Sequence, residues 1–401
     1  MKEAISISSL LRTRLQFFAV TKAMHATANS NYEWLIAGND IFPALLTGID
    51  AAQTSVRFEI YFFQDSPLAQ RFLAALVRAQ ERGAEVRMLV DAVGSLTLPN
   101  SFWDPLRKAG GVVRIFNPVA LRRFWIRNHR KLLVCDDHTA FIGGFNVATE
   151  YEGDGITSGW RDVGLKVAGP LVEQLVLSFE EMFDRADFQH KRFIRPLRFR
   201  FRRQKKFPAE QLLFSGPGRG SNQLKRALEL DLAHARNVQL TMPYFLPPRR
   251  LRRKLLQVVQ RGGRVQLILP GKSDVTLSLL AGQSLYRRFL DGNVEIYEYQ
   301  PQILHAKIII IDNIVYVGSS NLDPRSLHIN YELMLRLEHK ELAEGARKMF
   351  LFNLKHSKQI TAEDWRKSRT HWRRLKQRWA YFLLNHVDPY FARRLWRTLP
   401  H

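Results

Sequence analysis

The chain has 401 residues, of which 46% are hydrophobic, and a chain of this length and composition can build two sizeable cores. Its formal net charge of +24 requires an anionic partner, which restricts the partner classes to membranes and nucleic acids. The single cysteine, Cys135, excludes an intramolecular disulfide and suits a reducing compartment.

The amino-terminal segment, residues 1–30, is predicted to be amphipathic and is a candidate membrane anchor. Arg12 and Arg14 interrupt the apolar run that a signal peptide needs, so we do not expect a secretion signal. No run of 18 apolar residues occurs in the sequence, so no transmembrane helix is expected either. The residues on the apolar face of the segment are Ile7, Leu10, Leu11, Leu15 and Phe18.

The first half of the chain, residues 31–190, contains the signals of an α/β unit. Residues 56–62 and 82–89 contain strand signals, and a helical pattern precedes the second of them. A continuous apolar run at 132–135 indicates a further strand that is buried on both faces.

Polar residues frame this apolar run in the spacing H-x-K-x-x-x-x-D, with His129, Lys131 and Asp136, and Asn146 then closes a Gly-Gly turn. Positions two apart share a face of a strand, so a titratable base lies beside a fixed positive charge. Asp136 follows the histidine by seven residues, an odd separation that places its side chain on the opposite face. We therefore assign Asp136 a structural role.

The second half, residues 211–356, repeats the pattern with His305, Lys307, Asp312 and Asn321. A single histidine on such a strand would be interpreted as a hydrogen-bonded core residue. The duplication, with lysine and asparagine at matching offsets, instead indicates two half-sites for phosphoryl-transfer chemistry. The parity of the strand assigns Asp312 a structural role as well.

The similarity between the halves extends beyond the motifs. Residues 56–62 and 82–89 match residues 238–245 and 261–268, so the chain is two copies of one α/β unit. Each copy also places an acid at the head of the strand after its asparagine, Asp162 in the first and Glu332 in the second. Such a carboxylate can fix the tautomer of a catalytic imidazole, and an ordinary surface acid is the alternative.

The halves differ just before the first histidine. Eleven residues separate the aligned proline from the histidine in the first half and four in the second, which leaves an insertion of seven residues. We expect this loop to rim the active-site mouth and to bind the phosphate or acyl region of a lipid, and a solvated basic loop is the alternative. Its basic residues are Arg122, Arg123 and Arg127.

Two regions outside the repeated units concentrate positive charge. The predicted linker, residues 191–210, holds nine basic residues and no acid between 191 and 206. The predicted tail, residues 357–401, holds seven basic residues between Trp365 and Trp379, where Trp365, Trp372, Leu375, Trp379 and Phe382 recur at near-heptad spacing. This pattern predicts one basic amphipathic helix in the headgroup region of an anionic bilayer. Packing on the protein's own core and nucleic-acid binding are the alternatives.

The chain resembles the phospholipase D superfamily in its two motifs and in the glycine- and asparagine-containing turns that follow them. Within the superfamily, these turns and the stretch 89–95 resemble bacterial cardiolipin synthases of the short, peripheral type, which lack amino-terminal transmembrane helices. The resemblance covers roughly residues 35 to 355. It implies an α/β fold of two pseudo-twofold-related α/β/α domains, each with a mixed or mostly parallel sheet flanked by helices. It also implies that His129 and His305 meet in one cleft.

The resemblance further implies a phosphohistidine mechanism in which His129 attacks phosphorus and His305 protonates the leaving alkoxide. Lys131, Lys307 and the two motif asparagines would hold the non-bridging oxygens as charge builds on them. This chemistry needs no metal and no cofactor, and the sequence contains no H-E-x-x-H motif or Cys/His cluster. The implied reaction joins two phosphatidylglycerol molecules into cardiolipin and releases glycerol.

Other functions remain as alternatives. A phospholipase D would hydrolyse phospholipid headgroups with water as the acceptor. A nuclease of the same fold would bind the DNA backbone with its basic stretches. The third alternative is a membrane-binding protein without enzymatic activity. The basic and aromatic segments favour an anionic phospholipid surface over nucleic acid, and we expect a peripheral protein at the cytoplasmic face of a bacterial cell membrane. The sequence leaves the oligomeric state open.

Overall fold

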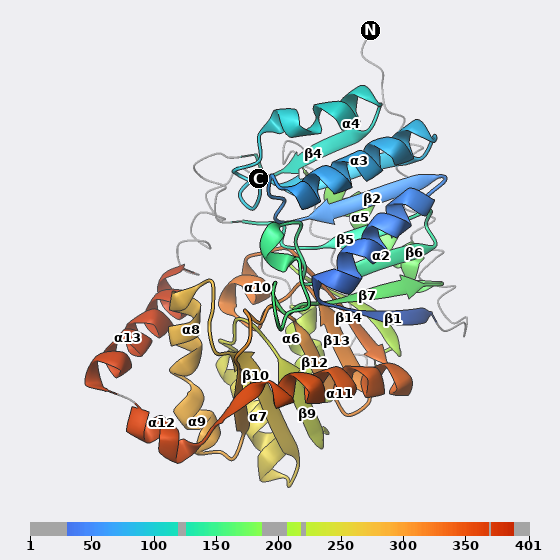
Figure 1. Cartoon of the computed structure of the whole chain (residues 1–401). Helices are drawn as coiled ribbons and strands as arrows, with labels where there is room; N and C mark the ends of the chain where they lie inside the picture. The colour runs from blue at the N-terminus through green and yellow to red at the C-terminus, as the bar shows by residue number, and fades with distance from the viewer. Residues whose placement is uncertain (1–29, 119–125, 187–206, 218–221, 369, 389–401) are drawn as a thin grey trace.

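The structure is a computed structural model that describes residues 30–118, 126–186, 207–217, 222–368 and 370–388 (Figure 1). The predicted amino-terminal segment, up to residue 29, and the basic stretch of the linker lie outside the described residues. Arg122 and Arg123 of the predicted insertion also lie outside them, whereas Arg127 is described.

Two β-sheets organise the chain, one from each half, and they lie one above the other in Figure 1. The first sheet has the strand order β1-β7-β6-β5-β2-β3-β4. Its strands are β1 (Asn31–Ile36), β2 (Ser55–Ile60), β3 (Glu85–Asp91), β4 (Val112–Phe116), β5 (Leu132–Cys135), β6 (Thr139–Gly143) and β7 (Val163–Ala168).

The second sheet has the order β15-β11-β10-β9-β12-β13-β14-β8. Its strands are β8 (Glu210–Ser215), β9 (Asn237–Thr241), β10 (Arg264–Pro270), β11 (Glu295–Tyr299), β12 (Ile308–Ile311), β13 (Ile314–Gly318), β14 (Glu332–Glu338) and β15 (Ser357–Ile360). The strand β15, which falls in the predicted tail, therefore extends this sheet by pairing with β11.

The prediction of two related α/β units is confirmed. Each sheet was expected to be mixed or mostly parallel, and both sheets are mixed. Only β2–β3 and β3–β4 in the first sheet, and β9–β10 and β10–β11 in the second, are parallel pairs. The other neighbours are antiparallel because the strand after each motif turns back through a short hairpin, from β5 to β6 and from β12 to β13.

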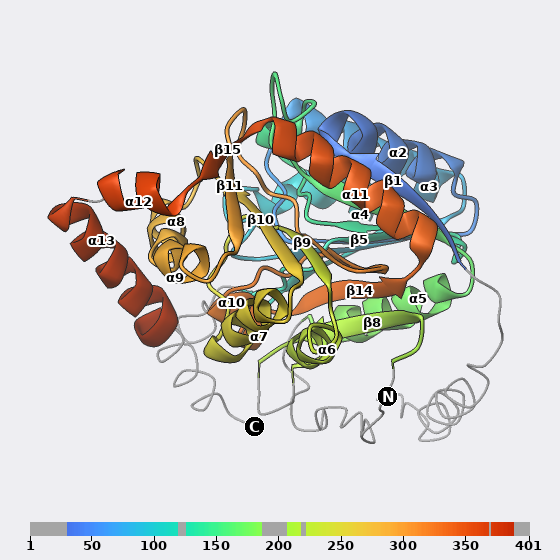
Figure 2. The ribbon, with the colours of Figure 1, turned by 90° about the horizontal axis from the view of Figure 1, so that it is seen from below.

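Helices flank both sheets (Figure 2). They are α2 (Ala37–Ala51), α3 (Pro67–Glu81), α4 (Asp104–Lys108), α5 (Leu171–Asp184), α6 (Gln223–Asp231), α7 (Arg249–Gln260), α8 (Thr276–Gln283), α9 (Tyr286–Leu290), α10 (Pro324–His328), α11 (Lys340–Lys355), α12 (Ala362–Ser368) and α13 (His371–Phe382). Short helical turns are Asn100–Trp103, Thr149–Tyr151 and Leu383–Val387. None of the helices in the described part of the chain is long and apolar enough to cross a membrane.

The motif strands are buried on both faces, which explains their continuous apolar sequences. Leu132 and Val134 of β5 join a core that also includes strands β12–β14 of the second sheet, so this core crosses the boundary between the halves. Leu133 and Cys135 point the other way, into the core beneath α2 and α3. The shared core holds the two sheets together and fixes the relative position of the two motifs.

The prediction of a single helix over residues 365–379 is wrong. Helix α12 ends at Ser368, and a new helix, α13, begins after Thr370, whose side chain accepts a hydrogen bond from the backbone N–H of Arg373. Trp365 is only 4% exposed and packs against Tyr286, with ring centroids 4.8 Å apart. Core packing is therefore the correct interpretation for Trp365, whereas the aromatic residues of α13 stay exposed.

Candidate active site

Both motif histidines lie in the short connections that precede β5 and β12, where the two halves meet. The backbone N–H of His129 donates to the carbonyl of Tyr331 at 2.9 Å, and that of His305 donates to the carbonyl of Arg161 at 2.8 Å. In each case the acceptor residue comes from the other half and immediately precedes an acid. The backbone therefore places each histidine beside the acid of the opposite half.

The side chains complete this crosswise arrangement. Nδ1 of His129 lies 3.1 Å from a carboxylate oxygen of Glu332, and Nδ1 of His305 lies 2.7 Å from a carboxylate oxygen of Asp162. All four side chains are at most 12% exposed. The structure thus brings together both predicted histidines and both predicted acids, in two pairs that each join the halves.

Two fully buried lysines lie beside the histidines. Nζ of Lys131 donates to the carbonyl of His129 at 2.7 Å. Nζ of Lys307 donates to the carbonyl of His305 at 2.6 Å and lies 2.9 and 3.0 Å from the two ring nitrogens of that histidine. Burial, partly offset by Asp162 and Glu332, lowers the pKa of Lys307 to about 8. Burial also lowers the pKa of Lys131 well below its ordinary value. An anion such as a phosphodiester beside the two amino groups would favour their charged forms.

The ionisation of the four groups differs between the pairs. Burial lowers the pKa of both histidines, that of His305 to about 4 with the help of Lys307, so both imidazoles are neutral at pH 7. Burial raises the pKa of Glu332 to about 8. Burial also opposes ionisation of Asp162, but His305 and Lys307 outweigh it and lower the pKa of this carboxyl. Of the two acids, Asp162 is therefore the one that is charged in the empty site.

The small turns after β6 and β13 leave room for the acids. A Cβ atom on Gly144 would lie 2.5 Å from a carboxylate oxygen of Asp162, so no larger residue fits there. Ser319 occupies the matching position in the second half, and its hydroxyl donates to Glu332 at 2.5 Å. The turns of the two halves thus support their acids in different ways.

The two motif asparagines, which follow these turns, are also buried. Asn146 accepts from the backbone N–H of Phe62 at 3.2 Å and donates to the hydroxyl of Tyr151 at 2.7 Å. The side-chain oxygen of Asn321 has no hydrogen-bond partner within the part of the chain that the structure describes.

Asp136 and Asp312 lie away from the histidines and bind backbone instead. The carboxylate of Asp136 accepts from the N–H groups of residues 53, 54 and 55 at 2.7 to 3.1 Å, and that of Asp312 accepts from Arg236 and Asn237 at 2.9 to 3.3 Å. The premise of strand parity is wrong, because each aspartate follows the end of its strand with a positive φ of 54° or 50°. The carboxylates fasten the turns after β5 and β12.

Behind the first motif lies a buried polar network that the sequence analysis did not identify. Asn128 donates through its side chain to Glu59 at 2.6 Å and through its backbone to Asp91 at 2.7 Å. Glu59 also pairs with Arg130 at 3.1 Å. By strand register Thr241 replaces Glu59 in the second half, so a comparison of the halves alone gives no signal for this network.

Aromatic residues cover the two histidines. The ring centroid of Tyr61 lies 4.8 Å from that of His129, and the Tyr61 hydroxyl accepts from Arg127 at 2.7 Å. The rings of Tyr151 and Trp160 lie 5.2 and 5.4 Å from that of His305, and the Tyr151 hydroxyl is 3.4 Å from its Nε2. Arg127 is the one basic residue of the predicted insertion that the structure places, and it lies at this site.

The described residues contain no group of three or more histidine, cysteine or acidic side chains that could hold a metal ion. The crosswise pairs, the two lysines and the aromatic cover form one site with two neutral imidazoles. Such a site can perform acyl or phosphoryl transfer with histidine as nucleophile and as general acid and base.

Comparison with known proteins decides between these chemistries. A family model described as "Cardiolipin synthase, PLD-like domain" matches residues 45–184 and 228–352. The chain belongs to this family. It is therefore a cardiolipin synthase-like phosphatidyltransferase of the phospholipase D superfamily, a class of enzyme that functions in phospholipid biosynthesis.

Individual relatives agree with this assignment. The chain is 32% identical to cardiolipin synthase A of Pseudomonas entomophila over 356 residues, which cover 85% of this chain and 72% of that protein. It is 30% identical to the major cardiolipin synthase of Bacillus subtilis over 358 residues, 88% of this chain and 74% of that protein.

Solved structures support the fold. The crystal structure of phosphatidylserine synthase from Haemophilus influenzae matches with a TM-score of 0.69 at 17% identity, and the match covers 90% of this chain and 95% of that chain. Polyphosphate kinase from Porphyromonas gingivalis matches with a TM-score of 0.56 at 13% identity over 84% of this chain and 49% of that chain. The paired domains of this cardiolipin synthase family member thus recur in proteins of low sequence identity.

Proposed function

We propose that the enzyme makes cardiolipin from two molecules of phosphatidylglycerol through a phosphohistidine on His129. The observation that carries the proposal is the crosswise pairing of His129 with Glu332 and of His305 with Asp162 around two buried lysines. Each carboxyl group holds Nδ1 of its histidine, which leaves Nε2 to react.

In the first step Nε2 of His129 attacks the phosphorus of the donor, and the bond from phosphorus to the glycerol headgroup oxygen breaks. His305 donates the proton that the departing alkoxide needs. Although His305 is neutral in the empty site, the negative phosphodiester and the charged Asp162 stabilise its imidazolium, so the substrate favours the protonated form. Lys131 and Lys307 stabilise the charge on the non-bridging oxygens.

In the second step His305, now neutral, takes the proton from a headgroup hydroxyl of a second phosphatidylglycerol. The alkoxide oxygen attacks phosphorus and displaces His129, which gives cardiolipin and restores the enzyme. One phosphodiester replaces another and no nucleotide is consumed. General acid–base catalysis of this kind contributes about 10²- to 10⁴-fold to the rate.

The proposed setting is the surface of an anionic membrane, with the enzyme bound peripherally at the cytoplasmic face. The net charge of +24 supports an anionic surface, and the buried free thiol of Cys135 agrees with a reducing compartment. Both substrates are lipids that reside in such a membrane.

The test is a product analysis of the enzyme with phosphatidylglycerol vesicles, by mass spectrometry of the lipids and an assay for free glycerol. We expect cardiolipin and glycerol in equal amounts, and neither product with His129→Ala. Phosphatidic acid as the main lipid product would identify the enzyme as a hydrolase that uses water as the acceptor. Cleavage of single-stranded DNA without any lipid product would identify it as a nuclease.

A further inference from the structure

Helix α13 presents a row of large apolar side chains to solvent. Trp372, Leu375, Trp379 and Phe382 are 74%, 47%, 59% and 52% exposed, and their spacing of three, four and three residues places them on one side of the helix. Gln377 and Ala380, on the other side, are buried. A soluble surface rarely gathers so many large apolar groups, and such a patch marks a binding surface.

The orientation of this row is fixed by contacts on the buried side of α13. Arg373 donates to Gln283 at 3.2 Å, and its guanidinium lies 5.3 Å from the ring centre of Trp365. Arg252 on α7 donates to the hydroxyl of Tyr381 at 3.2 Å. Because these contacts hold the opposite side of the helix, the exposed row is a stable feature of the surface.

Positive charge borders the exposed row. Arg374, Lys376 and Arg378 are exposed, and residues 371–387 contain no aspartate or glutamate. On a helical projection Arg374 and Arg378 flank the row on one side and Lys376 flanks it on the other. An apolar row between cations matches the interface of an anionic bilayer, where indole rings lie among the headgroups and cations lie near the phosphates.

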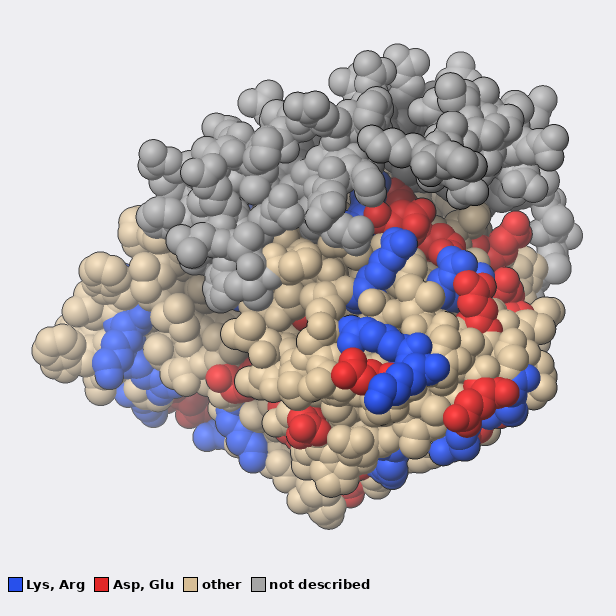
Figure 3. Space-filling model, turned by 90° about the horizontal axis from the view of Figure 1, so that it is seen from above, with Lys and Arg blue, Asp and Glu red and all other residues tan. Residues whose placement is uncertain are grey.

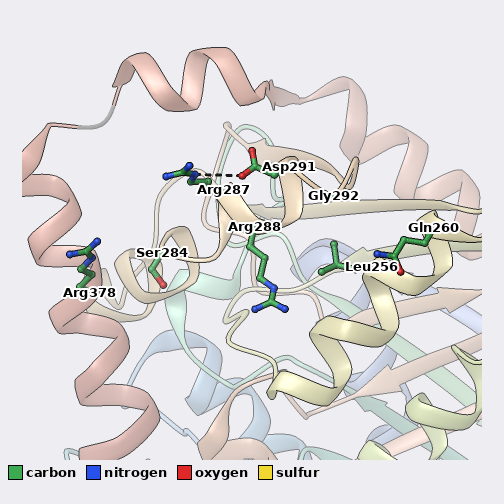
Figure 4. Close-up of a pocket in the computed structure, with 8 residues that line it drawn as sticks. All are labelled: Leu256, Gln260, Ser284, Arg287, Arg288, Asp291, Gly292 and Arg378. Carbon is green, nitrogen blue, oxygen red and sulfur yellow. Dashed lines mark ion pairs between the residues drawn. The ribbon is translucent and has the colours of Figure 1, made fainter.

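Next to α13 lies a hollow of about 570 Å³, bounded by α7, by the segment from the end of α8 through α9 and by Arg378 (Figure 4). Three arginines line it, Arg287, Arg288 and Arg378, and one acid, Asp291. Asp291 pairs with Arg287 at 3.5 Å. Among the described residues neither Arg288 nor Arg378 forms an ion pair, so the hollow carries positive charge suited to a lipid phosphate.

The surface of the first half is different. On the face shown in Figure 3, basic and acidic side chains lie beside one another. Exposed ion pairs of the first half include Arg71–Glu152 and Arg78–Asp50. Ion pairs attract an anionic membrane less strongly than unpaired cations do, because the opposite charges largely cancel. The surface around α13 therefore fits an anionic bilayer better than this face does.

The end of α13 leads to the active site. Asp388, six residues beyond the helix, pairs with Arg325 of α10 at 2.6 Å. Helix α10 begins three residues after Asn321, the motif asparagine of the second half, so Arg325 is held close to the site by the chain itself. A membrane that contacts α13 would therefore lie on the side of the molecule where α10 borders the site.

We propose that the exposed row of α13, with the hollow formed by Arg288 and Arg378, is a docking surface for anionic bilayers that presents the active site to its lipid substrates. The row enters the headgroup region, and the hollow takes the phosphate of one anionic lipid. This proposal deepens the proposed function and rests on a lipid substrate, but its binding test needs no catalysis.

The test is cosedimentation of the full-length chain with vesicles of phosphatidylglycerol and phosphatidylcholine. Replacement of Trp372, Trp379 and Phe382 by alanine should weaken binding by about tenfold or more, since each exposed aromatic contributes to insertion. Leu230→Ala with Leu351→Ala, which removes exposed apolar groups on α6 and α11, is the matched control and should leave binding unchanged. All these variants should keep full activity on a short-chain phosphatidylglycerol dispersed in detergent.

A second pair of variants tests the charges. Arg288→Gln with Arg378→Gln should reduce binding to phosphatidylglycerol vesicles about tenfold at low salt and leave the weak binding to pure phosphatidylcholine unchanged. Lys108→Gln with Lys348→Gln, at exposed sites on α4 and α11, is the control for a loss of two positive charges.

Vesicle binding by the aromatic variant equal to that of the unmodified chain would overturn the proposal. A loss of self-association in analytical ultracentrifugation, with vesicle binding intact, would instead identify the row as a contact between copies. If the enzyme made no lipid product but the variants lost vesicle binding, the proposed function would fail and the docking surface would stand.

Discussion

His305 and Asp162 are 143 residues apart in the sequence and belong to different halves of the chain, yet Nδ1 of the histidine lies 2.7 Å from the carboxylate. His129 and Glu332 repeat this relationship at 3.1 Å with the halves exchanged. Neither half therefore contains a complete histidine–carboxylate pair. Separation of the two domains would dismantle both pairs at once, so catalysis depends on the core that the two sheets share.

The two carboxyl groups should contribute unequally. Asp162 is charged in the empty site, whereas burial raises the pKa of Glu332 to about 8 and keeps it protonated at neutral pH. Asp162→Asn, which removes a charge that stabilises the imidazolium, should lower kcat by about 10²-fold or more, and Glu332→Gln should lower it by about tenfold. Steady-state kinetics at pH 7 with both folded variants checks this, and equal losses would contradict the assigned ionisation.

The motif aspartates should affect stability more than catalysis. Asp136→Asn weakens three backbone hydrogen bonds and should reduce the free energy of unfolding by about 1 to 3 kcal/mol, with most of the activity retained. Asparagine tolerates the positive φ at this position, so the change isolates the charge. Denaturant titration measures the loss, and a fully stable but inactive Asp136→Asn protein would show that the aspartate acts in catalysis.

The same aspartate predicts a pH dependence of stability. Burial opposes ionisation of Asp136, but the backbone N–H groups of Ser55, Gln53 and Thr54 lower its pKa to about 2, below the value of about 3.9 for an unfolded chain. Its contribution is therefore complete above about pH 4 and is lost as the pH falls through 2. The stability difference between Asp136→Asn and the unmodified protein should shrink over this window.

Lys307 should set the alkaline limit of activity. Burial lowers its pKa to about 8, so kcat/KM, which reports the free enzyme, should fall above that pH as the lysine loses its charge. Burial also lowers the pKa of Lys131 well below its ordinary value, so Lys131→Arg is combined with Lys307→Arg. The residual activity of this double variant should show no such fall, because arginine keeps its charge at all these pH values. The pKa of Glu332 is also about 8, so Glu332→Gln is the control. The activity of this variant should still fall above pH 8 if the lysines cause the fall.

The buried pair Glu59–Arg130 should be essential for folding of the first half. Glu59→Ala leaves a buried guanidinium without its carboxylate and should cost about 3 to 5 kcal/mol. The double variant Glu59→Leu, Arg130→Met should recover part of this loss. The exposed pair Arg71–Glu152 is a control, since Arg71→Ala should cost under about 1 kcal/mol. No recovery in the double variant would contradict the electrostatic explanation.

Much of the site could be predicted from the sequence because each half repeats the same site residues within a short stretch of sequence. The two H-x-K-x-x-x-x-D motifs and the acids at the heads of β7 and β14 recur at matching offsets, and the structure places these residues in one site. The crosswise pairing could not be predicted, because it depends on backbone bonds between Arg161 or Tyr331 and the opposite motif. Nothing in a single half specifies such contacts.

Other features escaped prediction because the halves differ there. Tyr151 lies five residues after Asn146, whereas Ser326 occupies the matching position after Asn321, so a comparison of repeats cannot select this tyrosine. In the tail, the near-heptad spacing from Trp365 to Phe382 suggested one helix. The cap at Thr370 instead divides the segment into a buried part and an exposed part, a division that depends on packing against Tyr286.

In the proposed mechanism His129 carries the phosphatidyl group between donor and acceptor. Rapid quenching of the enzyme with short-chain phosphatidylglycerol, followed by digestion at neutral to alkaline pH and mass spectrometry of the peptides, tests this covalent role. We predict an acid-labile phosphatidyl adduct on His129 that forms faster than cardiolipin appears and is absent from His129→Ala. An adduct on His305 alone would reverse the two roles, and rapid turnover by His129→Ala would contradict the covalent mechanism.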